Sequence, residues 1–235
     1  MPILSPGFDL LSHYPKPLLL GHRGAKAYAP ANTMEAFELA LQHGCDGLEF
    51  DVRLTADQQA VICHDPKFNR VEIAAAARQS LPELPTLDPV LQRFAARAFL
   101  DIELKVPGLE QVTLELLQRY PCERGYVITS FLPEVLQRIH AIDIDIPLGL
   151  ICRNRKQLAP ASSLPLASVV LHASVVSREV TSSFRDREVA VLVWGANRSA
   201  EMRSLVEAGA DALIIDDTRL GVETFRAKAY AAGNP

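Results

Sequence analysis

Nine short apolar runs recur along the 235-residue chain, and polar or helix-forming stretches separate most of them. Strands that alternate with helices are typical of a parallel sheet in the α/β class. No other feature of the sequence limits the possible folds as strongly. The nine candidate strands are residues 18–20, 47–54, 60–63, 98–104, 126–129, 146–151, 168–171, 189–194 and 212–215.

The spacing of the second and third runs favours a closed barrel over an open sheet. Only residues 55–59 lie between these runs, whereas a parallel crossover needs about a dozen residues or more. We therefore expect a β-hairpin there, which leaves eight strands for parallel pairing, the number in a (β/α)8 TIM barrel. The clearest helices are predicted at 33–43, 88–97, 108–119, 133–141 and 199–208, with a weaker one at 175–187.

The composition excludes several classes of partner. Lysine plus arginine number 24 and aspartate plus glutamate 28, and this net charge of −4 argues against nucleic acid and anionic membranes. No Gly/Ser linker or charge block divides the chain, so residues 1–235 are expected to form a single domain. The four cysteines are scattered, and no secretory signal or uninterrupted apolar span is evident. We therefore predict a cytoplasmic protein without membrane insertion.

Alternation along the second candidate strand brings acidic side chains to one face. Glu49, Asp51 and Arg53 share that face, while Phe50 and Val52 lie on the other. Two carboxylates about 4 Å apart repel by roughly 4 kcal/mol at an effective dielectric constant near 20. A cation or a shared proton is therefore expected beside them, unless the pair lies on a solvated strand edge.

A second run with the same alternation favours the cation. Asp101, Glu103 and Lys105 lie on one face of the strand at 98–104, and in a barrel the ends of different strands converge on the C-terminal mouth. Glu49, Asp51 and Glu103 would then supply hard oxygen ligands, which suit one divalent cation, Mg²⁺ or Ca²⁺, better than zinc.

The predicted hairpin places a histidine near this cation. A two-residue turn at Asp57 and Gln58 pairs residues whose numbers sum to 115, which sets His64 opposite Asp51. The alternative is an ordinary loop histidine, because Asp65 and a proline follow it directly.

The first candidate strand runs into the sequence Gly-His-Arg-Gly at 21–24. The glycines let the backbone turn sharply under a ligand, while His22 can carry a proton and Arg23 offers a planar fork to phosphate oxygens. Arg23 and Lys105 indicate an anionic substrate, and His22 with His64 could act as acid and base. Together with a metal ion, these groups fit the cleavage of a phosphodiester.

Several short motifs occur in a fixed order along the chain. They are GHRG at 21–24, PANT at 30–33, DGLEFDVRLTAD at 46–57, HD at 64–65, PTL at 85–87 and IELK at 102–105, with weaker matches at 130–131, 194–197 and 209–216. In these motifs and their spacing, nearly the whole chain resembles the glycerophosphodiester phosphodiesterase family.

The resemblance implies a TIM-barrel enzyme that hydrolyses small glycerophosphodiesters, such as glycerophosphocholine or glycerophosphoethanolamine, to sn-glycerol 3-phosphate and an alcohol. In the family pattern, the positions matching His22 and His64 are general acid and base, in an order that stays open. The resemblance also implies a divalent cation at Glu49, Asp51 and Glu103, and phosphate contacts by Arg23 and Lys105.

The chain departs from the family pattern at two places near the expected site. Ala31 replaces the glutamate of the usual P-E-N-T motif, and the insertion at 65–85 is short, which predicts a more open substrate cleft. Trp194, the only tryptophan, ends a strand and could pack against the glycerol moiety or be a core aromatic. His172 also ends a strand, where a hydrogen-bonded structural role is expected.

Two other functions remain open at this stage. A phosphodiesterase with the same barrel and metal could act on lysophospholipids or cyclic phosphodiesters, because the short insertion could admit a bulkier tail. A noncatalytic phosphodiester-binding protein is the alternative from another class, motivated by Ala31 and the altered motif at 211–218. The oligomeric state and the preferred head group cannot be derived from the sequence.

Overall fold

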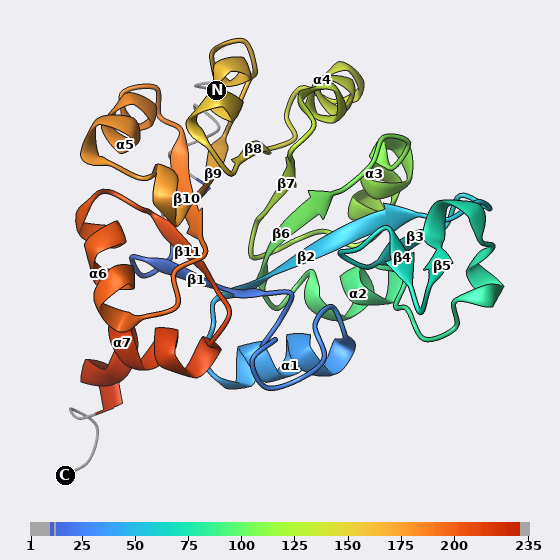
Figure 1. Ribbon diagram of the computed structural model, residues 1–235, viewed down its shortest axis with the longest axis horizontal. Coiled ribbons are helices and arrows are strands. Elements are labelled where there is room, and N and C mark those ends of the chain that lie inside the picture. Colours follow the sequence, from blue (N-terminus) through green and yellow to red (C-terminus); the bar gives the residue numbers. More distant parts are fainter. Residues whose placement is uncertain (1–9, 12, 231–235) are drawn as a thin grey trace.

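Eight parallel strands close into a barrel in the computed structural model, which describes residues 10, 11 and 13–230 (Figure 1). The sheet is closed because β1 pairs with both β11 and β2. This confirms the predicted (β/α)8 architecture. The strands are β1 (Leu18–His22), β2 (Gly47–Leu54), β6 (Phe99–Leu104), β7 (Tyr126–Ser130), β8 (Leu148–Cys152), β9 (Ser168–His172), β10 (Ala190–Trp194) and β11 (Ala212–Ile215).

Helices surround the barrel, and most begin where the sequence predicts them. The Thr33 side chain caps α1, accepting a hydrogen bond from the Ala36 N–H. A 3₁₀ helix, Arg155–Ser162, follows β8 in place of an α-helix, with Pro160 inside it. No helix among the described residues is long and apolar enough to span a membrane. The α-helices are α1 (Met34–Gln42), α2 (Leu87–Phe94), α3 (Glu110–Arg119), α4 (Pro133–Ile142), α5 (Arg178–Arg185), α6 (Ser199–Glu207) and α7 (Thr218–Tyr230).

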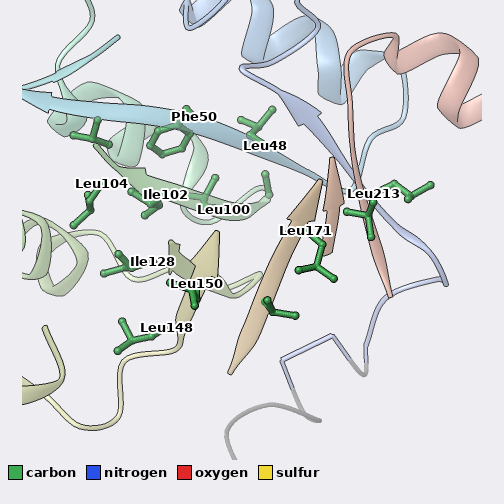
Figure 2. Packing of buried hydrophobic residues seen from close by; sticks show 14 of the residues in the cluster. Leu48, Phe50, Leu100, Ile102, Leu104, Ile128, Leu148, Leu150, Leu171 and Leu213 are labelled. Atoms are coloured by element: carbon green, nitrogen blue, oxygen red, sulfur yellow. The ribbon is translucent and has the colours of Figure 1, made fainter. Parts of the chain in front are cut away.

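Strand alternation divides the apolar side chains into two clusters. Residues such as Phe50 and Ile102 point out of the barrel and pack beneath the helices (Figure 2). Phe50 lies 5.6 Å from the Phe37 ring of α1, centroid to centroid. Residues such as Leu20 and Phe99 instead belong to a smaller cluster inside the barrel. The inward positions nearer the strand ends are therefore the ones that carry polar groups to the mouth.

The predicted hairpin is present, but its predicted register is wrong by one residue. Strand β3 (Ala60–Ile62) pairs antiparallel with β2, with Leu54 opposite Ala60 and Val52 opposite Ile62, so paired numbers sum to 54 + 60 = 114. The Thr55 N–H also donates to the Gln59 carbonyl oxygen at 3.0 Å, which leaves residues 56–58 as the turn, and Gln58 adopts a left-handed φ of 59°. As a result Cys63, not His64, lies opposite Asp51 and donates its N–H to the Asp51 carbonyl at 2.9 Å.

The segment between β3 and α2 forms a small lobe beside the hairpin. It contains the two-stranded β4 (Lys67–Phe68) and β5 (Val71–Glu72), and 3₁₀ turns at Ile73–Ala75 and Arg78–Ser80. Its apolar side chains pack against β3 in a third buried cluster, made of Val61, Cys63, Ile73, Ala76, Leu81 and Leu84. The short insertion is thus folded against the barrel edge next to the mouth.

Candidate active site at the barrel mouth

Parallel register brings the predicted charged residues together at the C-terminal ends of β1, β2 and β6, the polar half of the mouth. His22 lies beside Glu49, and Asp51 lies beside Glu103. They surround a pocket at the mouth of the barrel. Of the eight predicted site residues, seven line this pocket, and Asp51 is fully buried behind them: His22, Arg23, Glu49, His64, Glu103, Lys105 and Trp194.

Three carboxylates form the centre of the site. One oxygen each of Glu49, Asp51 and Glu103 lies within 4.8 Å of the others, and all three residues are buried. Burial and the neighbouring carboxylates raise the pKa of Glu49 well above its usual value and that of Glu103 to about 7. Such repulsion between buried oxygens is relieved by a bound cation, and the all-oxygen donor set fits a divalent ion. We call these three residues the carboxylate cluster.

Two cations and an amide hold Asp51 in its charged form. The Arg23 Nε lies 3.1 Å from Asp51 Oδ2, the Lys105 Nζ lies 3.2 Å from Oδ1, and Asn32 Nδ2 donates to Oδ2 at 2.8 Å. Burial acts to raise the pKa of Asp51, but these groups together keep it below its ordinary value. Lys105 also donates to Glu103 Oε1 at 2.5 Å, so it bridges two members of the cluster.

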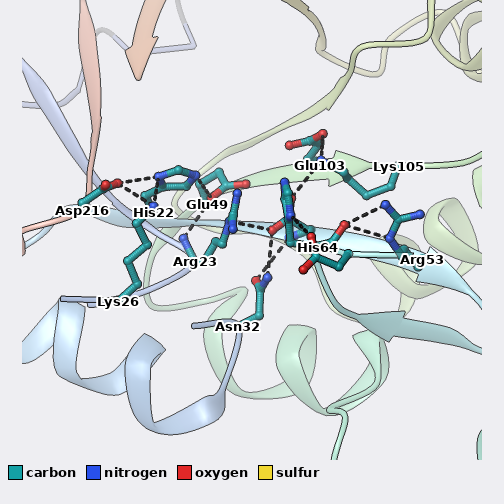
Figure 3. A network of polar contacts seen from close by, with 12 residues as sticks. His22, Arg23, Lys26, Asn32, Glu49, Arg53, His64, Glu103, Lys105 and Asp216 are labelled. Atoms are coloured by element: carbon teal, nitrogen blue, oxygen red, sulfur yellow. Dashed lines mark hydrogen bonds and ion pairs between the residues drawn. The ribbon is translucent and has the colours of Figure 1, made fainter. Parts of the chain in front are cut away.

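The loop after β1 wraps over the cluster because of its backbone conformation (Figure 3). Arg23 has a left-handed φ of 57°, and its N–H donates to Glu49 Oε2 at 2.9 Å. At Gly24, φ is 81° and a Cβ would come within 2.5 Å of the Ala36 carbonyl carbon, so only glycine fits. Asn32, the third residue of the PANT motif, also has a positive φ, 61°. Asn32 is therefore a site residue that the sequence patterns did not indicate.

His22 is held by two residues that the sequence analysis did not assign to the site. Its Nδ1 lies 2.6 Å from Asp216 Oδ1, and the Lys26 Nζ lies 2.8 Å from both atoms. His22 Nε2 faces the cluster, 3.8 Å from Glu49 Oε2. Burial lowers the pKa of His22, while the hydrogen bond to Asp216 opposes that shift. Asp216 directly follows β11, and this strand-end position was the signal that could have revealed it.

His64 reaches the pocket despite the different hairpin register, because it follows the end of β3. Arg53 donates to the His64 carbonyl oxygen through Nε at 2.9 Å and a terminal nitrogen at 2.7 Å, which fixes the backbone. The His64 Nδ1 lies 2.7 Å from Asp65 Oδ1, and the side chain is 37% exposed. Burial lowers the pKa of His64, and the charge of Asp51 partly offsets this.

The ends of β8 to β11 form the opposite half of the mouth, which we call the apolar half because most of its pocket-lining side chains are apolar. Ile151, Val170 and Ile214 line the pocket there, and the one charged lining residue is Arg153, whose guanidinium carbon lies 5.5 Å from the centroid of the Trp194 ring. The Trp194 ring contacts His172 edge-on, with centroids 4.6 Å apart, so it is both a packing residue and a wall of the pocket. The His172 Nδ1 is 2.7 Å from Ser174 Oγ, the hydrogen-bonded role expected for this residue.

Comparisons with known proteins agree with this architecture. A sequence model described as the Glycerophosphoryl diester phosphodiesterase family matches residues 22–220, which include all eight predicted site residues. A glycerophosphodiester phosphodiesterase of Caldanaerobacter subterraneus subsp. tengcongensis is 26% identical over 239 residues, covering 90% of this chain and 98% of the relative.

Solved structures show the same fold. A glycerophosphodiester phosphodiesterase from Thermotoga maritima has a TM-score of 0.78 at 24% identity, covering 90% of this chain and 99% of that one. An Oleispira antarctica phosphodiesterase in complex with the product sn-glycerol-3-phosphate has a TM-score of 0.77 at 25% identity, covering 87% and 94%.

Proposed function

Because the chain belongs to the glycerophosphoryl diester phosphodiesterase family and is therefore a hydrolase, we propose that it hydrolyses small glycerophosphodiesters with one divalent cation and two histidines. The products would be sn-glycerol 3-phosphate and an alcohol, from substrates such as glycerophosphocholine or glycerophosphoethanolamine. A relative of the same fold holds sn-glycerol-3-phosphate as product. The observation that carries the proposal is the carboxylate cluster with His22 and His64 lining one pocket.

The proposed cation is Mg²⁺ or Ca²⁺, held by Glu49, Asp51 and Glu103. The support is chemical: the donors are carboxylate oxygens, buried and close enough to share one ion. When bound, such an ion supplies positive charge that polarises a phosphoryl oxygen and stabilises the charge developing on it.

The two histidines are proposed as general acid and general base. They come from β1 and from the end of β3, and both of these strands pair with β2. Each uses Nδ1 to contact a carboxylate, Asp216 or Asp65, which leaves Nε2 available to the substrate. One imidazole would remove the proton of the attacking oxygen, and the other would protonate the departing alkoxide.

Arg23 and Lys105 are proposed to bind the phosphate, and Trp194 to contact the glycerol unit. Arg23 and Lys105 already lie beside the carboxylate cluster, where a metal-bound phosphodiester would place its oxygens. The guanidinium group suits planar, paired contacts to phosphate, while the ammonium group acts as a compact charge.

We also propose that residues 1–235 work as one catalytic domain in the cytoplasm. Among the described residues, the barrel begins at Leu18 and its last helix reaches Tyr230, and every strand except the small β4–β5 pair belongs to one sheet. The four cysteines are unpaired in the structure, which suits a reducing compartment.

Hydrolysis assays with ³¹P NMR test the proposal. With Mg²⁺ or Ca²⁺ added, glycerophosphocholine should give the signal of sn-glycerol 3-phosphate, and a chelator should abolish the reaction. A transient cyclic phosphate would indicate attack by the substrate's own hydroxyl. Preferential turnover of lysophospholipids or cyclic diesters would support the alternative substrate class. Binding without any product would support the noncatalytic alternative and refute the proposal.

A further inference from the structure

We propose that Asp101 and the indole N–H of Trp194 bind the hydroxyl groups of the substrate's glycerol unit, a pair we call the diol contacts. This inference rests on the proposed function and adds which residues of the pocket bind the glycerol hydroxyls. Neither residue is a ligand of the proposed cation. Both line the pocket at the mouth, Asp101 from β6 and Trp194 from β10.

Asp101 has one occupied and one free oxygen. The side chain is fully buried, and Thr129 Oγ1 donates to Asp101 Oδ1 at 2.6 Å. Its Oδ2 is buried and has no hydrogen-bond partner among the residues that the structure describes. Buried polar atoms are rarely left unpaired, and an exception in a pocket indicates a missing ligand.

Trp194 presents a second unpaired atom to the same pocket. Its Nε1 is buried, and within the described part of the chain nothing accepts its proton. The indole nitrogen is a donor only. The ring itself is held by the edge-on contact with His172 at 4.6 Å, so the direction of the N–H is fixed before a ligand arrives.

The chemistry of these atoms selects a polyol. A hydroxyl group can donate to the Asp101 oxygen and accept from the Trp194 N–H, and glycerol esterified at one end offers two such groups. Ile151, Val170 and Ile214 supply apolar surface for its carbon atoms. A trimethylammonium group, by contrast, has no proton to donate and no lone pair to accept one.

The position of Asp101 fits this orientation. Asp101 pairs in register with Glu49 and precedes Glu103 by two residues on the same face of β6, so a glycerol unit there lies next to the carboxylate cluster. The alcohol on the other side of the phosphate then extends toward His64, which is 37% exposed.

Calorimetric binding of two phosphate monoesters tests the pair without chemical turnover. sn-Glycerol 3-phosphate and propyl phosphate share the phosphate group but differ in the two hydroxyls. We expect the wild-type protein to bind sn-glycerol 3-phosphate about 10- to 100-fold more tightly than propyl phosphate. Propyl phosphate would leave the buried polar atoms of Asp101 and Trp194 without partners, and this is the loss of affinity expected from that. Asp101→Val and Trp194→Phe should each reduce that preference by about 10-fold, with little change for propyl phosphate.

Thr129→Val is the matched control. It removes the hydrogen bond between Thr129 and Asp101 Oδ1 but leaves Oδ2 in place, so the preference for sn-glycerol 3-phosphate should persist. If Thr129→Val loses the preference as fully as Asp101→Val, Asp101 has only a structural role and the inference is wrong. Melting curves show whether each variant folds. If Asp101→Val does not fold, Trp194→Phe still tests the diol contacts.

Fluorescence gives a second readout in the unmodified protein, because Trp194 is its only tryptophan. sn-Glycerol 3-phosphate should change the indole emission more than propyl phosphate does. Equal responses together with equal affinities would overturn the diol contacts while leaving the proposed hydrolysis intact. No binding of sn-glycerol 3-phosphate and no turnover of glycerophosphocholine would instead count against the proposed function itself.

Discussion

The two halves of the barrel mouth differ sharply in chemistry although the same fold builds both. The polar half, from β1, β2 and β6, carries the carboxylate cluster, His22, Arg23 and Lys105. The apolar half, from β8 to β11, lines the pocket with Ile151, Val170, Ile214 and Trp194, and Arg153 is its one charged lining residue. The proposed catalytic and metal-binding groups are thus concentrated on adjacent strands, where the strand register makes them neighbours, and the other strands mainly line the pocket with apolar side chains.

The polar half is also the less stable arrangement of the two. Glu49, Asp51 and Glu103 are buried with like charges within 4.8 Å, a configuration that opposes folding unless cations compensate. The apolar half buries side chains that stabilise the barrel directly. Substitutions in the polar half should therefore reduce activity without reducing stability. Substitutions in the apolar half should reduce stability with little loss of activity.

Glu49→Gln should have the largest effect on activity. Removing one ligand charge weakens the proposed cation site, and several kcal/mol of lost stabilisation correspond to a rate lower by roughly 10³-fold or more. The pKa of Glu49 is raised, so its ionised form destabilises the metal-free protein near pH 7. The variant should therefore melt at the same or a higher temperature without metal. Glu115→Gln on the exposed face of α3 is the control, with unchanged activity.

The histidine pair should show the next largest effect. His22→Gln and His64→Gln should each slow hydrolysis of glycerophosphocholine by about 10²–10⁴-fold, the usual contribution of a general acid or base. A substrate that releases p-nitrophenol needs no proton on its leaving group, so one of the two variants should recover most of its rate. That variant identifies the acid. If both variants or neither recovered, the division into one acid and one base would be contradicted. The control is His140→Gln on α4, which removes an imidazole far from the proposed site.

Ile214→Val tests the apolar half. Removing one methylene from this buried side chain should cost about 0.5–1.5 kcal/mol of unfolding free energy. The kcat should stay unchanged, because Ile214 has no titratable group, and KM should shift by less than about threefold. Urea unfolding and steady-state kinetics measure the two effects. A fall in kcat comparable to that of Glu49→Gln would remove the distinction between the halves.

Glu38→Gln should have the smallest effect and tests charge outside the mouth. Hydrogen bonds from Arg97 and Arg93 hold the pKa of this α1 carboxyl at about 2. Because the folded pKa lies below the unfolded value, the stabilisation is present above about pH 4.3 and is lost as the pH falls through about 2. The arginines are about half exposed, so we expect only about 0.5–1 kcal/mol at pH 7.

Denaturant unfolding at pH 7 and pH 3 should show this difference shrinking at the lower pH. Activity at pH 7 should be unaffected. A loss of activity would mean that charge on the outer helices also matters for the reaction.

The sequence predicted the strands and the polar half well because both follow from local alternation. The apolar runs became strands, and inward carboxylates at residues 49, 51 and 103 met at the mouth. The hairpin register was wrong because it depends on the backbone of one turn residue, Gln58, at φ 59°. Residue type alone did not reveal a left-handed glutamine.

Two of the site residues that the sequence did not reveal, Asp216 and Asp101, depend on contacts between different strands. Asp216 meets His22 across 194 residues of chain, through the pairing of β1 with β11. Asp101 alternates with Glu103 on β6, but its unpaired oxygen becomes apparent only once Thr129 is seen to occupy the other one. Partners of this kind follow from the pairing of strands in the sheet and not from spacing along the sequence.

Binding of Mn²⁺, followed by electron paramagnetic resonance, tests the carboxylate cluster most directly. Mn²⁺ prefers the same oxygen ligands as Mg²⁺. The account predicts one site per wild-type chain, competed by Mg²⁺ or Ca²⁺ and lost or weakened at least about 10-fold in Glu49→Gln and Glu103→Gln. Equal Mn²⁺ affinity in the wild type and both variants would contradict it.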